Sequence, residues 1–501
     1  MEKQYLLGID IGTSAAKVAL FKKESGNRPV GVTSAEYPIF YPAPGHVEQN
    51  AEHWWEAVCR ATRELLEKTG VPSGAIAGIG IDGQSWAAVA IDKEGKTLCP
   101  TPIWCDTRSA DICAELSEQY GEDRFWQTSL NPLQPGYSFP KLIWYKRNAP
   151  EVYRNMAAVL QSNGFIAFRL TGKISQDLSQ ANGFACFDLK KGEWDKALCR
   201  EVGVRDDILP ELCGSHEIVG GVTAEAARAT GLAEGTPVVA GGLDTACDAL
   251  GAGVIAPGDT QEQGGQSGGM SICTNTPSTD KRLILCRHVV PGHFLLQGGT
   301  VGGGAILRWF HQNFGGPSLG EAAFAVADRE AEMVAPGSDG LLLLPYLAGE
   351  RSPIWDPQSK GVYYGLDYNK TRGHFHRANM EAAALALRHN LETAVEVGAP
   401  IGVLRASGGA AKSPLWTQIK ADVTGYTIEV PEAFSTAAFG AAVLAGVATG
   451  VYADFAEAAG GIRVTRVHTP NPDNREVYDT SFNTFRTLYE TLKPIMHGEN
   501  R

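Results

Sequence analysis

The chain carries an acidic residue beside a short turn of glycine, threonine and serine near its N-terminus. Apolar, β-prone residues run into Asp10, the turn Gly12-Thr13-Ser14 follows, and a second β-prone run leads away. A hairpin turn of this kind offers backbone N–H groups and two hydroxyls, which are the donors that a phosphate group needs. Asp10 would repel a phosphate unless a metal ion lies between the two. The alternative is an ordinary hairpin turn at a domain edge.

A second acidic residue, Asp244, follows an apolar segment and two glycines. We place a domain boundary near Gly241, and ligands commonly bind between domains. A carboxylate there can accept the proton of a substrate hydroxyl that attacks phosphorus, a role that contributes roughly 10²–10⁴ in rate. The alternative is an aspartate that caps a turn.

Two further clusters would suit a polyhydroxylated ligand. Asp106 and Arg108 are two positions apart, so both would point to one face if the segment is extended. The alternative for this pair is a plain surface ion pair. Gln84, Ser85 and Trp86 form a polar turn with an indole that could stack on a sugar face, although Trp86 could equally pack in the core.

The polar segment Glu350-Arg351-Ser352-Pro353 follows the apolar run 341–346, which we predict to be a strand. The segment is a further candidate for chemistry. The alternative is a salt bridge within a loop.

Three glycines imitate a dinucleotide-binding fingerprint. Gly78, Gly80 and Gly83 have the spacing G-x-G-x-x-G. That fingerprint must open a helix, whereas here a predicted strand follows, so we exclude a dinucleotide site.

The length and charge of the chain narrow its class. At 501 residues it exceeds what one hydrophobic core usually holds, so we expect two domains. Lys and Arg total 44 against 56 Asp and Glu, a formal net charge of −12, which argues against nucleic acid and anionic membrane as partners. No apolar run approaches the ~20 residues that a membrane helix needs.

The cysteines point to a reducing compartment. The ten cysteines are scattered, without a Cys-x-x-Cys pair or a compact Cys/His cluster, so neither a zinc site nor a disulfide framework is expected. The N-terminus enters a predicted strand without the pattern of a signal peptide. We therefore expect a cytoplasmic protein with reduced thiols.

Several elements can be predicted around these residues. We expect a helix over residues 51–68, capped by Asn50 and stopped by Gly70, and strands over 75–81 and 87–91. A glycine-rich turn at 263–268 lies between β-prone segments, as the first turn does. We therefore expect the chain to consist of two halves of related construction.

The second half is richer in predicted helix. Residues 380–394 carry an apolar stripe, and residues 405–416 read as a strand, a small-residue turn and a helix, which would let a flat ring or a phosphate approach the backbone. Residues 436–448 form an Ala/Gly-rich helix, whose lack of bulk predicts close packing against backbone.

In their order along the chain, these segments resemble the FGGY carbohydrate kinases. Each motif is weak alone, and the resemblance extends from Gly8 to about Gly450. The matching motifs are Gly8-Ile-Asp10-Ile-Gly12-Thr13-Ser14 and Gly265-Gln266-Ser267-Gly268 for the two phosphate motifs, Trp104-x-Asp106-x-Arg108 for the sugar segment, Gly241-Gly242-Leu243-Asp244 for the catalytic base, Gly361-Val-Tyr-Tyr-Gly365-Leu with Asn379-Met-Glu381 for the C-terminal signature, and Gly408-Gly409-Ala410-Ala411-Lys412-Ser413 for the adenosine motif.

The resemblance implies a fold and an activity. The fold is an α/β, two-domain actin-like ATPase (ribonuclease H-like) fold with a central cleft, with a sugar-binding domain at 1–246 and a nucleotide-binding domain at 247–501. Residues 345–353 and Gly83-Gln84 are most similar to xylulokinases. The implied reaction transfers the γ-phosphoryl group of MgATP to a ketopentose hydroxyl, with D-xylulose giving D-xylulose 5-phosphate.

Two departures from the xylulokinase pattern bear on substrate and nucleotide. Ser85-Trp86 stands where xylulokinases have Met-His and glycerol kinases have Arg-Glu, so glycerol is not expected and the sugar is open. Gln266 replaces the threonine of the second phosphate motif and can still donate a hydrogen bond. The alternatives are a kinase for ribulose, gluconate or another polyol, a sugar-binding relative without turnover, and a non-catalytic actin-like nucleotide switch.

The resemblance also assigns roles to individual residues. Asp244 would be the catalytic base and Asp10 would orient magnesium. The partners would be a small-molecule sugar and ATP, and a homodimer is a possible assembly. The sugar would bind Gln84, Ser85, Trp86, Asp106, Arg108 and Asp244. The nucleotide would bind Gly12, Thr13, Ser14, Lys17, Gly265, Gln266, Ser267, Gly408, Gly409, Ala410 and Ser413.

Overall fold

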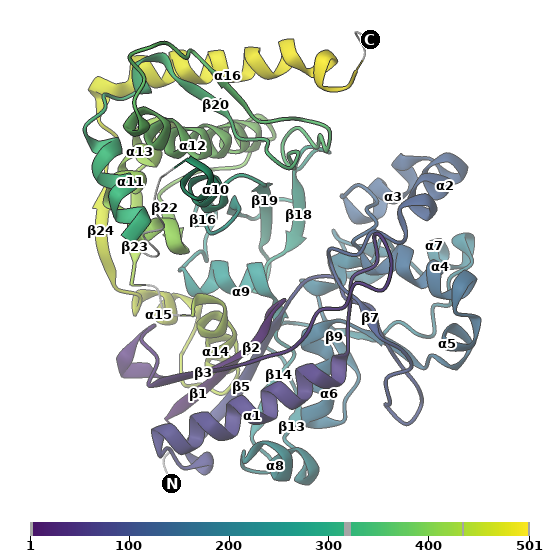
Figure 1. Cartoon of the computed structure of the whole chain (residues 1–501). Helices are drawn as coiled ribbons and strands as arrows, with labels where there is room; N and C mark the ends of the chain where they lie inside the picture. The colour runs from purple at the N-terminus through teal and green to yellow at the C-terminus, as the bar shows by residue number, and fades with distance from the viewer. Residues whose placement is uncertain (1–3, 315–321, 433–434, 499–501) are drawn as a thin grey trace.

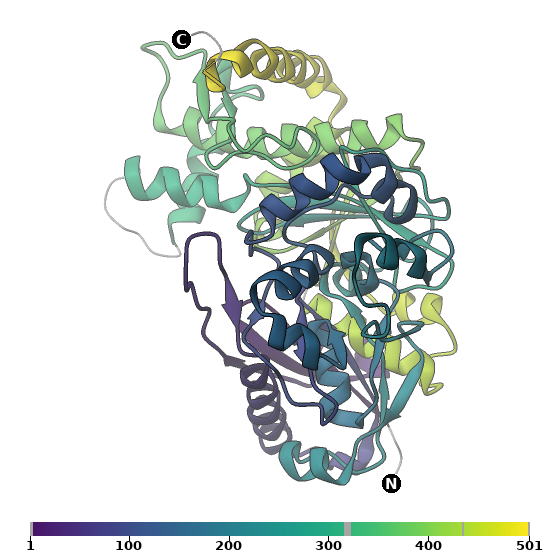
Figure 2. The same cartoon turned by 90° about the vertical axis from the view of Figure 1, so that its right-hand side faces the viewer.

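A computed structural model describes residues 4–314, 322–432 and 435–498. The chain forms two halves, each built on a seven-stranded sheet, with the N-terminal half at the bottom and right of Figure 1 and the C-terminal half at the top. In the view turned by 90°, the two termini lie at opposite ends of the molecule (Figure 2).

The first sheet has the strand order β13-β14-β5-β1-β2-β3, and β15 also pairs with β5. Its strands are β1 (Tyr5–Ile11), β2 (Ala15–Lys22), β3 (Gly31–Glu36), β5 (Ile76–Gly83), β13 (Ile218–Gly221), β14 (Pro237–Val239) and β15 (Gly242–Leu243). The opening hairpin is confirmed, because β1 and β2 pair antiparallel around the predicted turn.

The second sheet has the order β18-β19-β17-β16-β22-β23-β24. Its strands are β16 (Thr260–Gly264), β17 (Gly268–Thr274), β18 (Ile284–Arg287), β19 (Phe294–Thr300), β22 (Leu404–Ser407), β23 (Ile428–Pro431) and β24 (Val464–His468). It repeats the plan of the first sheet. The β16–β17 hairpin is antiparallel and β22 runs parallel to β16, as β5 runs parallel to β1. The predicted internal repeat is confirmed.

Helix α1 (Ala51–Thr69) covers one face of the first sheet, where it packs on β2 and β3, and its buried apolar side chains share one core with Val18 and Leu20 of β2. Its limits are the predicted ones. The side chain of Asn50 accepts a hydrogen bond from the Glu52 N–H at 3.0 Å, and Gly70 adopts the left-handed conformation that ends the helix.

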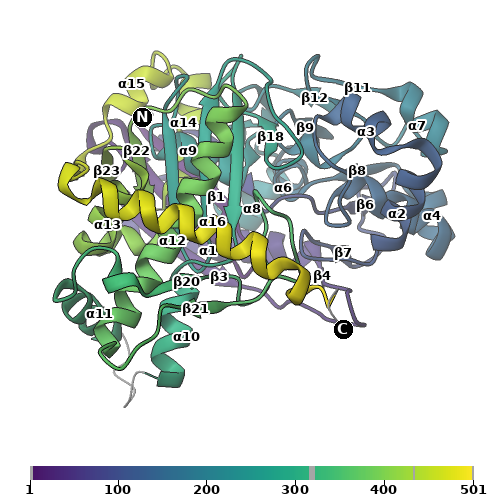
Figure 3. The same cartoon turned by 90° about the horizontal axis from the view of Figure 1, so that it is seen from above.

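The remaining helices surround the two sheets and form a lobe beside the first one. In the first half they are α2 (Ala110–Tyr120), α3 (Glu122–Ser129), α4 (Ser138–Asn148), α5 (Pro150–Asn155), α6 (Ser162–Thr171), α7 (Lys196–Val202) and α8 (Ala224–Thr230). In the second half they are α10 (Gly304–Phe314), α11 (Ala322–Glu332), α12 (Arg372–Glu396), α13 (Pro414–Thr424), α15 (Phe455–Gly460) and α16 (Arg475–Met496). Seen from above, α16 crosses α12 and α13 on the outside of the second half (Figure 3).

Short strand pairs complete the loops around the sheets. They are β4 (Glu48–Gln49) with β7 (Thr101–Pro102), β6 (Val89–Ile91) with β8 (Ala158–Leu160), β9 (Ser175–Asp177) with β12 (Glu211–Cys213), β10 (Phe187–Asp188) with β11 (Glu193–Trp194), and β20 (Leu342–Leu344) with β21 (Val362–Tyr364).

Two helices rich in small residues, α9 (Asp244–Gly251) and α14 (Thr436–Ala448), lie between the sheets in Figure 1. Helix α14 belongs to the second half of the sequence but packs on β1 and β5 of the first sheet. A Cβ on Gly8 would lie 1.8 Å from the Ala438 carbonyl oxygen, and one on Gly80 would lie 1.8 Å from that of Ala441. The predicted close packing of this helix against backbone is confirmed.

Helix α9 was not predicted, because its small residues carry no clear apolar stripe. A Cβ on Gly440 of α14 would lie 1.9 Å from the carbonyl oxygen of Cys247 in α9, so the two helices also meet at backbone distance. The domain boundary predicted after residue 246 falls within α9 and stays a prediction. In the described part of the chain, no helix combines the length and the apolar character needed to cross a bilayer.

Candidate active site

The first phosphate motif forms the turn between β1 and β2. Gly12 N–H donates to the Ala15 carbonyl at 3.1 Å, and Ser14 is exposed. Thr13 is held from two sides. Its carbonyl accepts from Gln49 Nε2 at 2.7 Å, and its hydroxyl oxygen accepts from Trp104 Nε1 at 3.1 Å. The turn is therefore fixed in place while its outer edge stays open.

The second phosphate motif forms the equivalent turn between β16 and β17, where Gly265, Gln266 and Ser267 are exposed. Its backbone is tied to the start of α10, since Gly304 N–H donates to the Gly265 carbonyl at 2.9 Å. With the Gln266 amide turned so that its oxygen faces α10, Oε1 accepts from Arg308 Nη2 at 2.7 Å and Nη1 at 2.8 Å. The Gln266 NH₂ group is then left free to donate.

The adenosine motif follows β22. Gly408 has φ 83°, and a Cβ there would lie 2.6 Å from the Gly264 carbonyl oxygen, so this turn packs directly on the second phosphate motif. Gly409 is exposed and Ala410 is buried. Ser413 caps α13, because its side chain accepts from the Trp416 N–H at 3.0 Å.

A cavity of about 530 Å³ joins the first half of the chain to the adenosine motif. Asp10 and Lys17 line it from the first sheet and Asp248 lines it from α9. The remaining lining residues are Gly408, Ala411, Lys412, Val430, Pro431, Glu432, Ser435, Thr436, Ala437, Thr465 and Arg466. The cavity therefore connects the carboxylates of Asp10 and Asp248 with the adenosine motif.

Asp10 and Asp82 lie side by side at the ends of parallel strands, because β1 and β5 pair with Asp10 opposite Asp82. Asp82 is fully buried, and its oxygens accept no hydrogen bond from any N–H or O–H group among the described residues. Burial raises the pKa of both carboxyls, and the charges of Asp10 and Asp244 raise the pKa of Asp82 further. Lys17 Nζ lies 3.5 Å from Asp10 Oδ2, and its charge opposes the rise in the pKa of Asp10.

The sequence prediction missed Asp82. Its signal was present, because Gly80-Ile81-Asp82 repeats the Gly8-Ile9-Asp10 pattern of β1. The repeat lies within the three glycines that imitate a dinucleotide fingerprint.

Asp244 begins α9 directly after β15, which pairs with β5 so that Leu243 lies opposite Gly83. Its carboxylate accepts from the Thr245 N–H at 2.7 Å. The pKa of Asp244 is raised to about 7, chiefly by burial and in part by the charges of Asp10 and Asp248, whereas the hydrogen bond from the Thr245 N–H opposes the rise. A half-exposed carboxyl with this pKa can take up a proton near neutral pH.

Asp248, one helical turn after Asp244, was also missed. Its carboxylate accepts from Gln261 Nε2 at 2.5 Å and from the Thr436 hydroxyl. Burial raises the pKa of Asp248, and these two hydrogen bonds oppose that effect. Asp248 thereby links α9, the second sheet and α14 beside the cavity.

The turn at 84–86 follows β5 and so lies next to Asp244. Gln84 is buried, its Nε2 donates to Gln49 Oε1 at 2.7 Å, and its Oε1 has no donor among the described groups. Ser85 is half-buried. Trp86 has φ 56°, and its ring lies 4.3 Å from that of Tyr137.

Gln49 is a buried hub that sequence reasoning missed. One end of its amide donates to Thr13 and the other accepts from Gln84 and, at 3.1 Å, from Trp54 Nε1 of α1. It therefore connects the first phosphate turn to the turn at 84–86.

Asp106 and Arg108 form a buried pair in a turn rather than on an extended strand. Arg108 Nε donates to both Asp106 oxygens at 2.9 Å, and its Nη2 also donates to Glu48 Oε1 at 2.7 Å. Asp106 is fully buried and the Arg108 side chain is 3% exposed, so this pair supports its loop, and its predicted contact with a sugar stays a prediction. The exposed group of the segment is the indole of Trp104.

Lys141 of α4 is a second buried support that was missed. Its Nζ donates to the carbonyls of Trp86 at 2.9 Å, Ile103 at 2.8 Å and Gly136 at 2.6 Å. Burial lowers the pKa of Lys141 to about 7, whereas the charge of Asp106 opposes that shift. The three carbonyls lie in the loops that carry Trp86, Trp104 and Tyr137.

Two similar α/β halves that hold glycine-rich turns around buried carboxylates define a phosphotransferase of the actin-like ATPase fold. Comparison with known proteins gives the family. Residues 5–251 match the N-terminal domain and residues 267–449 match the C-terminal domain of the FGGY family of carbohydrate kinases. The chain belongs to this family and is a carbohydrate kinase.

Similar proteins with known names cover nearly the whole chain. A xylulose kinase of Bacillus subtilis is 32% identical over 98% of this chain and 98% of its own, and a gluconokinase of the same species is 30% identical over 98% and 96%. A crystal structure of xylulose kinase from Rhodospirillum rubrum has a TM-score of 0.92 and 32% identity over 99% of this chain and 100% of its own.

Proposed function

We propose that this enzyme transfers the γ-phosphoryl group of MgATP to a hydroxyl of D-xylulose and releases D-xylulose 5-phosphate and ADP. The observation that carries the proposal is the position of Asp244. Its carboxyl, with a pKa of about 7, lies one helical turn before Asp248, which lines the cavity, and beside the turn at 84–86. The similarity to xylulose kinases along the full chain supports the choice of sugar.

The three glycine-rich turns would hold the nucleotide. Gly12, Thr13 and Ser14 would face the phosphates from one side, and Gly265, Gln266 and Ser267 from the other, with Lys17 beside them. Gly408 and Gly409 leave room for the adenosine, because nothing lies within 4 Å of a Cβ built on Gly409. Ala410 is buried beneath this turn. Ser413 would contribute indirectly, because its side chain caps the start of α13.

The residues present fit a magnesium ion. Mg²⁺ prefers hard oxygen ligands and usually binds one or two carboxylates together with waters and substrate phosphates. Asp10 and Asp82 offer such oxygens, and the buried, partnerless carboxyl of Asp82 would gain from a nearby cation. When bound, the ion would neutralise charge on the phosphates.

The sugar would lie against Ser85, Trp86 and Trp104, next to Asp244. The buried Asp106–Arg108 pair and the Gln84 amide would hold the surrounding loops in place. In the reaction, Asp244 Oδ would accept the proton of the attacking hydroxyl as its oxygen approaches phosphorus. The N-terminus of α9 would stabilise the ionised form of Asp244.

The deciding experiment measures ADP release with MgATP across pentuloses, hexuloses, polyols and sugar acids. We expect a strong rise with D-xylulose, by at least about 10² over the sugar-free rate, because a positioned base contributes that much. If gluconate increases ADP release instead, the substrate is gluconate, as the name of the gluconokinase relative suggests. ATP hydrolysis that no sugar increases would contradict a sugar kinase.

Location and assembly are part of the same proposal. All ten cysteines are unpaired, as expected for a protein of the reducing cytoplasm. A homodimer stays a prediction, which light scattering of the purified protein would test.

A further inference from the structure

The segment Glu350-Arg351-Ser352-Pro353 takes no part in the proposed mechanism, yet several hydrogen bonds fix its conformation. Glu350 Oε1 accepts from the Val301 N–H at 2.6 Å and from the Arg351 N–H at 2.8 Å. The Ser352 hydroxyl accepts from the Gly299 N–H at 2.7 Å and donates to the Gly299 carbonyl at 3.2 Å. These bonds clamp the loop to the end of β19.

The one positively charged side chain of this loop is that of Arg351. Arg351 is exposed, whereas its neighbours Glu350 and Ser352 are 5% and 1% exposed. Its guanidinium has one hydrogen-bond acceptor in the described part of the chain, the Thr300 carbonyl at 3.1 Å from Nη2. No carboxylate there lies within ion-pair distance, so most of its N–H groups are free.

The guanidinium lies over β19 because residue 299 is glycine. A Cβ on Gly299 would lie 3.1 Å from Arg351 Cζ. Two residues earlier on the same face of the strand, about 7 Å away, Gln297 Nε2 donates to the Thr245 hydroxyl at 3.1 Å. Arg351 is therefore on the face of the second sheet that meets the start of α9, where Asp244 lies.

The same strand end also borders the second phosphate motif. Thr300 pairs with Gly268, and the chain then returns along the turn, with Gly304 N–H bonded to the Gly265 carbonyl. Arg351 thus stands between the turn that would hold the terminal phosphates and the carboxylate that would act as base.

A cation such as Arg351 would offset the negative charge of the proposed site. The walls of the site hold Asp10, Asp82, Asp244 and Asp248, and a nucleotide adds further negative charge. Among the nearby cations, Lys17 lies beside Asp10 and Arg308 can bind the Gln266 amide, whereas Lys412 and Arg466 line the cavity on the side of the adenosine motif. A free planar guanidinium is suited to binding phosphoryl oxygens through two parallel hydrogen bonds.

We propose that Arg351 binds the γ-phosphoryl group of the nucleotide and stabilises its charge during transfer. The inference rests on the proposed kinase function. Cations that contact a phosphoryl group in transfer lower the barrier chiefly by electrostatic stabilisation. Glu350 and Ser352 are positioning residues in this account, because they hold the loop and not the phosphate.

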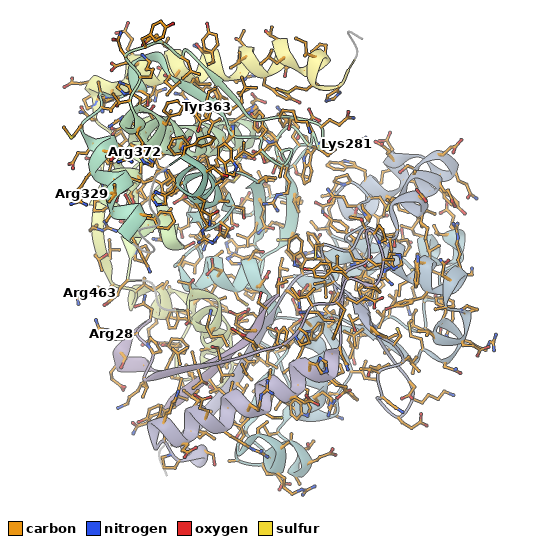
Figure 4. All side chains as sticks on the ribbon, viewed as in Figure 1. Arg28, Lys281, Arg329, Tyr363, Arg372 and Arg463 are labelled. Carbon is orange, nitrogen blue, oxygen red and sulfur yellow. The ribbon has the colours of Figure 1, made fainter. Side chains whose placement is uncertain are left out.

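The test compares Arg351→Met and Arg351→Lys with the matched control Arg329→Met. Arg329 is exposed on α11, at the outer edge of the molecule in Figure 4. For each protein, calorimetry measures the Kd of MgADP and of the β,γ-imido analogue of MgATP, and turnover is measured with the best sugar of the panel.

We expect Arg351→Met to weaken the imido analogue about tenfold while the Kd of MgADP stays within about twofold, since only the analogue carries a γ-phosphate. Its kcat should fall about 10²-fold, with Arg351→Lys between it and the wild type. Equal losses for both nucleotides, or no loss for either, would overturn the proposal. The binding arm needs no sugar, so it decides even if the wild-type enzyme phosphorylates none of the panel.

Discussion

At the scale of single residues, the chemistry centres on Asp244. A carboxyl with an ordinary pKa is a weak base at neutral pH, whereas one with a pKa near 7 matches its working range. Here burial supplies most of the shift, and the charges of Asp10 and Asp248 add to it. Burial and the neighbouring carboxylates thus make Asp244 a stronger base than an ordinary carboxylate.

The first prediction concerns the pH dependence of turnover. The base acts in its ionised form, so kcat/KM should rise with pH and level off above an apparent pKa near 7 rather than near 4. A bound cation would move that value downward. A pH–rate profile with saturating MgATP measures it.

Asp244→Asn is the companion variant and should lower kcat by at least about 10². Its thermal stability should not fall, because the amide removes a buried charge. A variant that kept a tenth of wild-type turnover would rule out Asp244 as the base.

The second prediction concerns Asp82. The folded state raises its pKa, so the folded protein binds more protons than the unfolded chain above the usual carboxyl pKa, and stability falls as pH rises through that window. Asp82→Asn removes this effect and should raise the Tm of the ligand-free protein at pH 7 by about 2 °C or more. Differential scanning fluorimetry at pH 5 and pH 8 measures it, and the gain should be larger at pH 8.

The same variant should lose activity and respond less to magnesium, because Asp82 lies beside Asp10. An Asp82→Asn enzyme with a lower Tm at pH 8 and normal activity would contradict both the electrostatic argument and the proposed role.

At the scale of elements, the site depends on two helices that have almost no side-chain bulk. Helices α9 and α14 meet at backbone distance, and α14 also lies directly on β1 and β5. Larger residues would separate Asp244 and Asp248 from Asp10. The small residues therefore position the carboxylates rather than merely fill space.

The third prediction tests this packing. Gly440→Ala would place a Cβ 1.9 Å from the Cys247 carbonyl, and we expect it to lower the free energy of unfolding by more than about 2 kcal/mol. Gly74→Ala is the matched control, because nothing lies within 4 Å of its Cβ, and its effect should stay within about 0.5 kcal/mol. Urea denaturation of both variants measures the difference.

At the scale of the whole molecule, the two halves are joined in more than one place. Besides α9 and α14, Asn131 of the first half pairs with the backbone of Leu285 in β18, through bonds of 2.8 and 3.0 Å. A single cluster of buried apolar side chains also contains residues of both halves, from Phe139 and Phe184 to Ile272 and Leu296.

The fourth prediction follows from this joint core. Scanning calorimetry of the ligand-free protein should show one cooperative transition, because neither half can unfold without exposing the other. A fragment of residues 1–246 should fail to fold alone, since β1 and β5 would lose the cover of α14. Two separate transitions, or a fragment with native-like circular dichroism, would show independent domains instead.

Local features could be predicted from the sequence: both glycine-rich hairpins, the limits of α1 to within one residue, the small-residue helix α14 and the order of motifs typical of the family. These follow from chemistry read over a few neighbouring residues, such as turn-forming glycines, a helix cap and periodic apolar side chains. Asp10 and Asp244 were identifiable because each follows an apolar strand at a glycine-rich turn.

Only the tertiary structure decided which polar residues share the site. Asp82 joins Asp10 through the parallel register of β1 and β5, and Asp248 joins them because α9 forms. Arg108 proves to be buried and paired with Asp106 and Glu48, whereas the guanidinium of Arg351 has only the Thr300 carbonyl as an acceptor among the described residues. The physical reason is that burial, pairing and charge balance arise from contacts between segments far apart in the chain, which no local pattern encodes.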